Sequence, residues 1–196
     1  MRKLLTFALL VFLSLFAFAQ QKPEPFGLKL GISTKEETMN VIAKEGGRVV
    51  DSGYKVIKGD VVNPNVEGVE VERLPVDNLT SATFWFFKGK LYRIEYRFPL
   101  STKREEFYVI FEQLRKKYGN PRRSVRLYLL ERLYFLDFPL DHIAEWNFGD
   151  VRMRLIAPWA SWSMYLIYEH TPTAREVEKS DQEVFNKETA KPKRGL

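Results

Sequence analysis

The chain has 196 residues, contains no cysteine and carries a formal net charge of +6, with 29% charged and 45% hydrophobic residues. The lack of cysteine excludes disulfides, thiolate metal sites, cysteine nucleophiles and a lipid-modified N-terminal cysteine. The length and hydrophobic content are typical of one sizeable globular domain, or of two small ones that share a sheet.

The N-terminus has the parts of a secretory signal peptide. Arg2 and Lys3 are followed by an uncharged apolar run over residues 4–18. This run is shorter than the ~20 residues that a transmembrane helix needs. Small residues at Ala17 and Ala19 predict cleavage between Ala19 and Gln20.

Residues 1–19 are therefore interpreted as a signal peptide, and we expect an exported protein, periplasmic or secreted. Without cleavage, the same segment would tether the protein to the membrane. Loss of Arg2 and Lys3 lowers the net charge from +6 to +4. A modestly basic exported protein could meet anionic lipid, polysaccharide or an acidic protein, whereas nucleic acid is not an expected partner there.

A capping signal marks the first predicted helix. Ser33/Glu36 and Thr34/Glu37 both fit the capping box, in which a hydroxyl and a carboxylate three residues later satisfy free backbone amides. Apolar residues at positions 39, 42 and 43 then fall on one helical face, and Gly46-Gly47 ends the helix.

A similar pattern recurs further along the chain. Thr102 and Glu105 form a second candidate capping box, and a helical stripe of apolar residues follows, made of Phe107, Ile110, Phe111, Leu114 and Tyr118. We interpret the two patterns as repeated helix-plus-strands units of one domain, residues 20–98 and 99–170. The alternative is chance, because capping boxes are common.

Strand patterns follow the first helix. Residues 48–57 resemble a hairpin around Ser52-Gly53, 59–68 resemble a loop, and 69–74 a short strand. The clearest hairpin joins residues 79–87 to 90–98 through Lys88-Gly89. Its second arm alternates apolar and charged residues, which predicts one buried face and one face in water.

The second unit continues with a strand-rich segment, a loop, a hairpin and a last strand, at residues 124–135, 137–142, 144–157 and 161–168. Gly149-Asp150 is the turn of this hairpin. Residues 171–196 are rich in Pro, Lys and Glu and are predicted to be a polar tail, disordered or loosely helical.

Two amphipathic helices and seven to nine antiparallel strands predict an α+β two-layer sandwich. The helices would cover one face of the antiparallel sheet and leave the other open.

Two segments resemble a family of small exported bacterial domains. They are Leu28-x-Leu30-Gly31-Ile32-Ser33-x-x-Glu36 with its helix, and Phe86-Phe87-x-Gly89-x-Leu91-x-x-Ile94. Over about residues 26–168 they resemble the BamE-like domains of outer-membrane assembly lipoproteins and the related beta-lactamase-inhibitor-protein-like fold.

That resemblance implies a tandem duplication on a continuous sheet and non-catalytic protein–protein binding, often through the open sheet face. The chain departs from the family pattern because it lacks the lipobox cysteine, has one convincing helix in its first unit, and has Pro99-Leu100 where a glycine would precede the second cap.

Motifs for catalysis or metal binding are missing. The sequence has no G-x-S-x-G elbow, P-loop, G-x-G-x-x-G or H-E-x-x-H. Asp141-His142 and Glu169-His170 could each be half of a metal site, but zinc requires three or four convergent ligands, so two surface histidines are the simpler interpretation. We therefore predict no catalytic residue, no metal and no cofactor.

Four arginines occupy strand positions that should face water: Arg93, Arg97, Arg152 and Arg154. If their strands are neighbours, they would form a positively biased open sheet face, interrupted by Glu95. A basic stretch at Arg115, Lys116, Lys117, Arg122, Arg123 and Arg126 is either an anion or lipid-headgroup patch or a set of cations that offsets the helix macrodipole.

Trp159 and Trp162 follow Pro158 in a predicted turn. Tryptophan at a surface is a typical hot spot for partner recognition and also stacks on sugars. The alternative is that both side chains lie under the sheet edge.

The sequence thus predicts a non-enzymatic exported module that binds an envelope protein through its open sheet face and Trp159/Trp162. An envelope hydrolase with unidentified carboxylates would instead require a deep pocket holding two acids of raised pKa. A carrier of an apolar or anionic ligand would require a cavity between the helices and the sheet.

Overall fold

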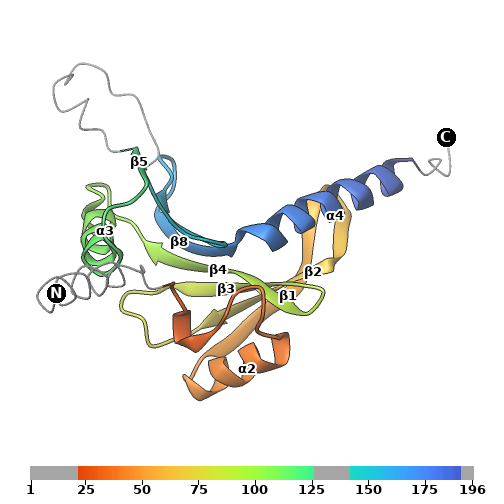
Figure 1. The fold of residues 1–196 in the computed structure, drawn as a ribbon, viewed down its shortest axis with the longest axis horizontal. Coiled ribbons are helices and arrows are strands. Elements are labelled where there is room, and N and C mark those ends of the chain that lie inside the picture. Colours follow the sequence, from red (N-terminus) through yellow and green to blue (C-terminus); the bar gives the residue numbers. More distant parts are fainter. Residues whose placement is uncertain (1–21, 126–141, 191–196) are drawn as a thin grey trace, which may run out of the picture.

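The computed structural model of the protein describes residues 22–125 and 142–190. Its elements, in chain order, are η1 (Pro25–Gly27), α2 (Lys35–Lys44), β1 (Arg48–Lys58), β2 (Val61–Glu72), β3 (Ser81–Phe87), β4 (Lys90–Pro99), α3 (Glu105–Tyr118), β5 (Arg123–Val125), β6 (His142–Phe148), β7 (Val151–Ala157), β8 (Ser163–His170) and α4 (Thr171–Thr189) (Figure 1).

Several predictions fall outside the described residues: the signal peptide and its cleavage after Ala19, the strand over 126–135, the loop over 137–141, and Arg126. Among the helices that are described, none has the length and apolar character needed to cross a membrane.

All eight strands form one antiparallel sheet in the order β1-β2-β3-β4-β8-β7-β6-β5. In each unit a helix precedes four strands that pair in chain order, and the units meet where β4 pairs with β8. The predicted α+β class with two helix-plus-strands units is confirmed by this arrangement.

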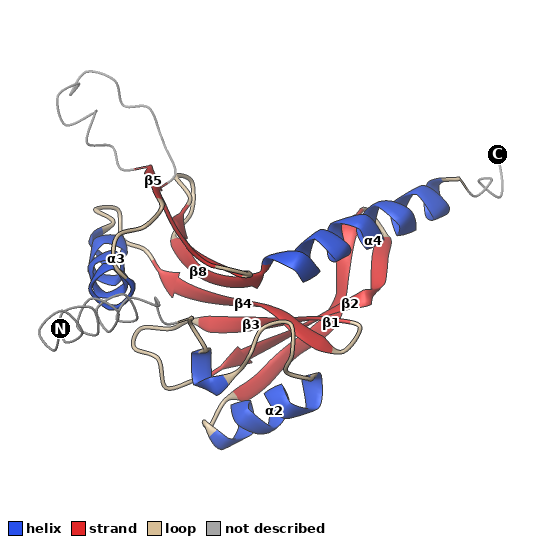
Figure 2. Cartoon of the chain, viewed as in Figure 1, coloured by secondary structure: helices blue, strands red, loops and turns tan. Residues whose placement is uncertain are grey.

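Helices α2 and α3 cover one face of the sheet, named here the helical face (Figure 2). Alternate residues of the strands and the inner sides of both helices build one apolar cluster, whose members include Ile42, Phe84, Ile94, Phe107, Phe111, Trp146, Met153 and Leu155. This two-residue period in the strands is the alternation that the sequence shows.

The start of α2 is as predicted. The Glu37 amide donates to Thr34 Oγ1 at 3.1 Å, and the Thr34 amide donates to Glu37 Oε2 at 2.9 Å. Both halves of the capping box are therefore present at Thr34/Glu37.

The prediction of a second capping box at Thr102/Glu105 is wrong. Helix α3 begins at Glu105 after Arg104, which adopts a left-handed conformation with φ 57°. Ser101 donates from its amide and its hydroxyl to Glu106 Oε2, at 3.1 and 2.7 Å. The helix thus begins two residues later than the Thr102/Glu105 pattern indicates, and Arg104 at its start makes tertiary contacts described below.

Both predicted tight hairpins are present. Strands β3 and β4 are joined at Lys88-Gly89, where both residues have positive φ, as a tight type I′ turn requires. Strands β6 and β7 are joined at Gly149-Asp150.

The hairpin predicted around Ser52-Gly53 and the loop predicted over residues 59–68 are wrong. Ser52-Gly53 lies inside one continuous strand, and Asn63-Pro64-Asn65 lies inside β2. Tyr54 pairs with Glu67 while Lys55 pairs with Asn63, so Pro64 is accommodated in a bulge. Proline in a strand is tolerated at such an irregularity, because no ladder hydrogen bond from its nitrogen is required there.

The tail, predicted to be disordered or loosely helical, is helical over most of its length. Residues 171–189 form α4. Val177 of α4 packs with Val66, Phe87 and Tyr92. Because Phe86 belongs to the helical face and successive side chains alternate, Phe87 and α4 lie on the opposite face. The predicted open face is therefore partly covered.

Candidate functional site

The four predicted arginines lie on the face opposite α2 and α3, but they surround an acid. Arg93 and Arg152 are the register partners of Glu169 on either side of β8. Glu169 Oε1 lies 2.5 Å from Arg152 Nη2 and 3.9 Å from Arg154 Nη2, and Glu169 Oε2 lies 3.7 Å from Arg93 Nη1. The side chain of Glu169 is only 7% exposed.

Two further acids pair with arginines of this face. Arg93 Nη2 lies 2.5 Å from Glu95 Oε2, and Arg97 Nη2 lies 3.9 Å from Glu70 Oε1. The predicted positively biased surface is thus a mixed-charge network, named here the Glu169 network. Sequence reasoning missed it because β8, which carries Glu169, inserts between β4 and β7.

The pKa values of Arg152 and Arg154, both in the Glu169 network, shift in opposite directions. The hydrogen bond to Glu169 raises the pKa of Arg152. Burial lowers the pKa of Arg154, against the opposing attraction of Glu169. These guanidinium groups are already engaged within the chain, so they offer little free charge to an anionic ligand.

Trp159 and Trp162 are exposed, with 55% and 72% of their surface in water. They lie in the turn between β7 and β8. The Arg104 guanidinium donates to the carbonyl oxygens of Pro158 and Trp159 at 3.0 and 2.6 Å and lies 5.5 Å from a Trp159 ring centroid. The amide of Leu100 donates to the Trp162 carbonyl at 2.9 Å.

A third aromatic residue continues this surface. Tyr108 of α3 is exposed, and its hydroxyl lies 3.2 Å from His142 Nε2. His142 Nδ1 in turn lies 3.5 Å from Arg104 Nη1. We name the surface formed by Tyr108, Trp159 and Trp162 the aromatic end.

The centre of the Glu169 network lies away from the aromatic end. Arg152 lies near the start of β7 and Trp159 follows its end, so about seven residues of strand, roughly 20 Å at the usual rise, lie between them. Arg152 is therefore distant from the tryptophans, whereas Arg97, whose register partner is Tyr165, lies nearer to Trp162.

The histidines do not converge on a metal site. His142 pairs with Ala157 at one end of β7, and His170 pairs with Val151 at the other. His170 Nδ1 lies 2.8 Å from Thr173 Oγ1, and its Nε2 lies 3.2 Å from Asp150 Oδ2. Within residues 22–125 and 142–190, no group of three or more metal-ligating side chains is present.

The basic stretch is spread around the end of α3. Arg115 bonds Glu112 on its own helix at 2.8 Å. Arg115 and Lys116 line a shallow hollow with Gly119, whereas Lys117 lines a different and larger pocket. Arg123 begins β5.

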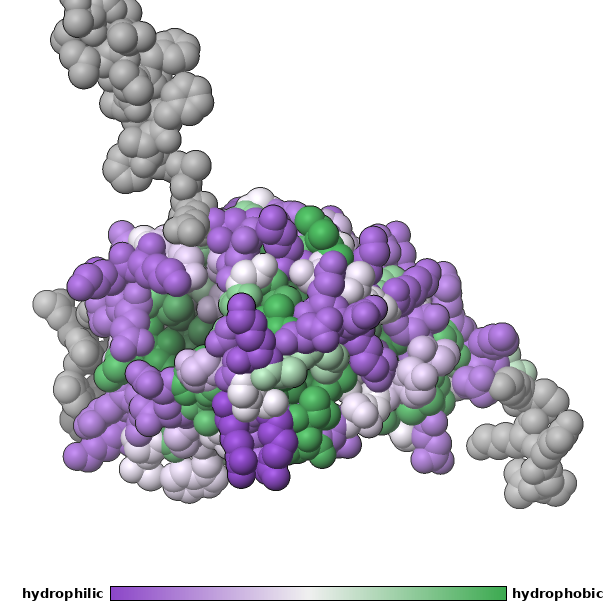
Figure 3. Space-filling model, turned by 90° about the horizontal axis from the view of Figure 1, so that it is seen from below, coloured by the Kyte–Doolittle hydropathy of each residue, from purple (hydrophilic) through white to green (hydrophobic). Residues whose placement is uncertain are grey.

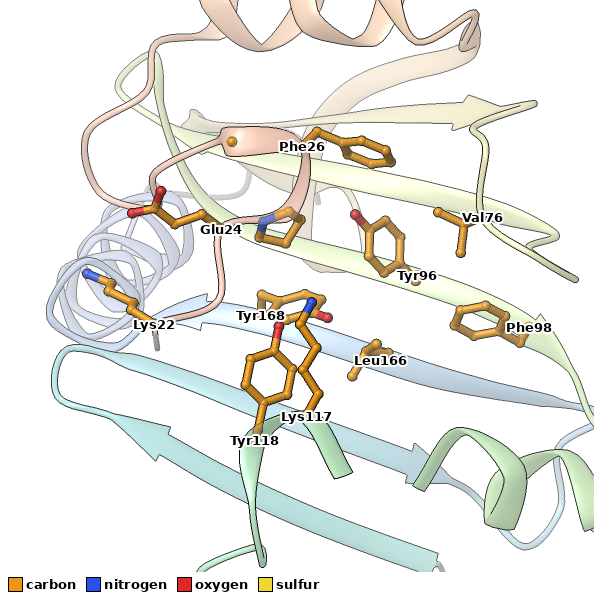
Figure 4. A pocket seen from close by; sticks show the side chains of 12 residues that line it. Lys22, Glu24, Phe26, Val76, Tyr96, Phe98, Lys117, Tyr118, Leu166 and Tyr168 are labelled. Carbon is orange, nitrogen blue, oxygen red and sulfur yellow. The ribbon is translucent and has the colours of Figure 1, made fainter. Parts of the chain in front are cut away.

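The larger pocket lies on the helical face, where the two units meet. It has a volume of about 650 Å³ and opens to solvent. Its lining side chains, shown in Figure 4, are Lys22, Glu24, Pro25, Phe26, Gly27, Val76, Tyr96, Phe98, Lys117, Tyr118, Leu166 and Tyr168. Seen from the side of α2, apolar residues reach the surface in hollows between charged ones (Figure 3).

Together these features define a two-unit α+β sandwich with an exposed aromatic end and one pocket at the seam of its units. The chain belongs to the TP0088 domain family, whose model matches residues 25–180 and so spans η1 through the first half of α4. None of the curated proteins compared with the chain matches it significantly.

Among solved structures, the chain is similar to a DUF4309 family protein, YjgB, from Bacillus subtilis. The two share 13% sequence identity, with 78% of this chain and 88% of that chain covered and a TM-score of 0.38.

Proposed function

We propose that this protein is a non-catalytic exported module that binds a protein partner in the cell envelope through its aromatic end. The observation that carries this proposal is the exposure of Trp159 and Trp162 in one turn. Large apolar side chains grouped at a surface mark interaction sites, and tryptophan is the residue most enriched among binding hot spots.

The way this turn is held also favours recognition. Arg104 fixes the carbonyl groups of the turn, and the Leu100 amide fixes its other arm. A surface that is already ordered loses less conformational entropy when a partner binds. Arg104 adopts a strained left-handed conformation to reach this position, which favours a role for the turn beyond chain reversal.

The Glu169 network is the weaker candidate for the same role. Its arginines form ion pairs with acids of the same sheet, although the Nε atoms of Arg93, Arg152 and Arg154 have no hydrogen-bond partner among the described residues, and α4 covers the neighbouring part of this face. Nor does an observation on residues 22–125 and 142–190 favour an envelope hydrolase. Glu24 is the one carboxylate among these residues that lines the seam pocket, and hydrogen bonds lower the pKa of Glu106 and of Asp150 instead of raising it.

The test is a crosslinking capture from envelope extracts with the double variant Trp159→Ala/Trp162→Ala. The expected result is loss of the partner bands that the unchanged protein captures. Because both side chains are exposed, the free energy of unfolding should change by less than about 0.5 kcal/mol each.

A matched control is Tyr54→Ala, which removes an exposed aromatic ring from β1, far along the sheet from the turn. It should leave the captured bands in place. Recovery of the same bands with the double tryptophan variant, or equal loss with Tyr54→Ala, would contradict the aromatic end as the binding surface.

A further inference from the structure

The seam pocket is built from both units at once. Tyr96 and Phe98 of β4 and Leu166 and Tyr168 of β8 form its apolar floor, where the two central strands pair. The Tyr96 and Tyr168 rings meet edge to face at a centroid distance of 5.9 Å. Phe26 of η1 closes the opposite side. The volume, about 650 Å³, lies within the range of roughly 300–1,000 Å³ usual for small-molecule sites.

Polar groups converge at one end of this floor. In the view of Figure 4 the side chains of Lys117, Tyr118 and Tyr168, which all line the pocket, point toward one another, and Lys117 Nζ lies 5.1 Å from the Tyr118 ring centroid. Burial raises the pKa of Tyr96 and of Tyr168, so both phenols keep their protons at neutral pH and can donate hydrogen bonds. A set of phenol donors beside an ammonium group is suited to an anion.

Of the two lysines that line the pocket, Lys117 is the one placed to bind this anion. Lys22, the other lysine of the pocket, is paired with Asp150 at 2.7 Å. Lys117 makes no salt bridge to a carboxylate of the described residues and lies 5.1 Å from the Tyr118 ring centroid. Arg115 and Lys116, its neighbours on α3, line the other hollow.

The single acid of the pocket sets the orientation of a ligand. In Figure 4 the Glu24 carboxylate lies on the Lys22 side, away from the three tyrosines and Lys117. An anionic group is repelled from that rim and attracted to the Lys117 end, while an apolar body covers the floor.

We infer that the seam pocket binds a small amphiphilic carboxylate, its apolar body on Tyr96, Phe98, Leu166 and Phe26 and its carboxylate on Lys117 and the hydroxyl of Tyr168. This site is distinct from the aromatic end, and neither depends on the other.

The experiment is a fluorescence titration of the purified protein with cis-parinaric acid, an apolar chain with one terminal carboxylate, and with its uncharged methyl ester. The unchanged protein is expected to bind the acid saturably at one site and at least about tenfold more tightly than the ester, because only the acid accepts charge-assisted hydrogen bonds.

Variants of the pocket separate its two parts. Lys117→Met keeps the apolar stem but removes the charge, and should weaken binding of the acid at least about tenfold while leaving that of the ester within about twofold. Tyr168→Phe keeps the ring and should weaken binding of the acid about threefold to tenfold. Lys116→Met, one residue away on the same helix, is the matched control and should leave both affinities unchanged.

Three results would overturn the inference: no saturable binding of the acid, equal affinities for acid and ester in the unchanged protein, or equal losses in Lys117→Met and Lys116→Met. The titration uses no partner protein, so a negative titration does not contradict the proposed binding of a partner at the aromatic end. A negative capture experiment likewise does not contradict ligand binding in the pocket.

Discussion

The two faces of the sheet differ in the kind of side chain that they bury: apolar side chains on one and, in the middle of the other, charged side chains. The helical face is apolar where α2 and α3 pack on it, whereas β1, at the edge of the sheet, is largely exposed, and the seam pocket opens on this face. The opposite face holds the Glu169 network in its middle and α4 at one side. An apolar face can be completed by any helix of matching shape, whereas a buried charge requires a specific partner at short distance. The strands β4 and β8 contribute to both, because alternate residues point to opposite faces.

The largest expected effect is on the helical face, at Trp146. Its side chain is fully buried, and its Nε1 donates to the Gly119 carbonyl at 2.9 Å. Trp146→Ala removes a large ring from a packed core and should lower the free energy of unfolding by about 3–5 kcal/mol. Urea unfolding followed by circular dichroism measures this loss. A loss under about 1 kcal/mol would show that the core at β6 is not tightly packed.

On the charged face, Glu169→Gln should lower stability by about 2–3 kcal/mol, because it leaves three arginines around an uncharged amide. The arginines are partly exposed, so solvent screening reduces the cost below that of a fully buried pair. The control is Glu70→Gln, whose partner Arg97 is 3.9 Å away and exposed, with an expected cost of about 0–1 kcal/mol. Equal costs in both variants would count against Glu169 as the centre of the network.

The docking of α4 should depend on Asn63. This side chain is fully buried in the β2 bulge, and its amide nitrogen donates to Ser180 Oγ at 3.0 Å and to Asp181 Oδ1 at 2.8 Å. Asn63→Ala should cost about 1–2 kcal/mol and speed hydrogen exchange of the α4 amides selectively. Asn186→Ala, on the exposed part of α4, is the control. Unchanged exchange in Asn63→Ala would mean that other contacts of α4, such as the packing of Val177 and the Lys55–Asp181 ion pair, hold the helix without Asn63.

The smallest effect concerns Asp150, in the β6–β7 turn. The hydrogen bond from Lys22 lowers the pKa of Asp150, and His170 lowers it further. A carboxyl group with a lowered pKa stabilises the fold above its unfolded pKa, near 3.9, and loses that contribution as the pH falls through its folded pKa. Lys22→Met should therefore raise the pKa of Asp150, as measured by NMR titration. Lys29→Met should not move it, and an unchanged pKa in Lys22→Met would exclude the pairing.

Local patterns were sufficient where the local and tertiary preferences agree. The alternation in β4 and β7 predicted the hairpin arms, because one face of each strand lies in the apolar core. Thr34/Glu37 predicted a helix start because the capping box is formed by residues close in sequence. The exposure of Trp159 and Trp162 was one of two alternatives that the sequence left open.

Local patterns failed where a distant segment decides the conformation. Asn63-Pro64-Asn65 has the composition of a loop, but α4 bonds Asn63 and stabilises the bulge that holds the proline in β2. Residues 171–189 have too few apolar side chains to predict packing, yet Val177 packs with Val66 and Phe87, and Ala174 packs against the same cluster. Thr102 is a residue type that commonly caps helices, but α3 begins after Arg104, whose guanidinium binds the β7–β8 turn.

The sequence by itself determined the α+β class, the two units, and the pattern of buried and solvent-facing residues in the central strands, because these depend on the period of side chains along each element. Tertiary structure decided which elements become neighbours. The pairing of β4 with β8 placed Glu169 among the arginines that the sequence singled out, and placed Tyr96 beside Tyr168 in the floor of the seam pocket. Both sites join residues about seventy positions apart, so no local period of the chain encodes them.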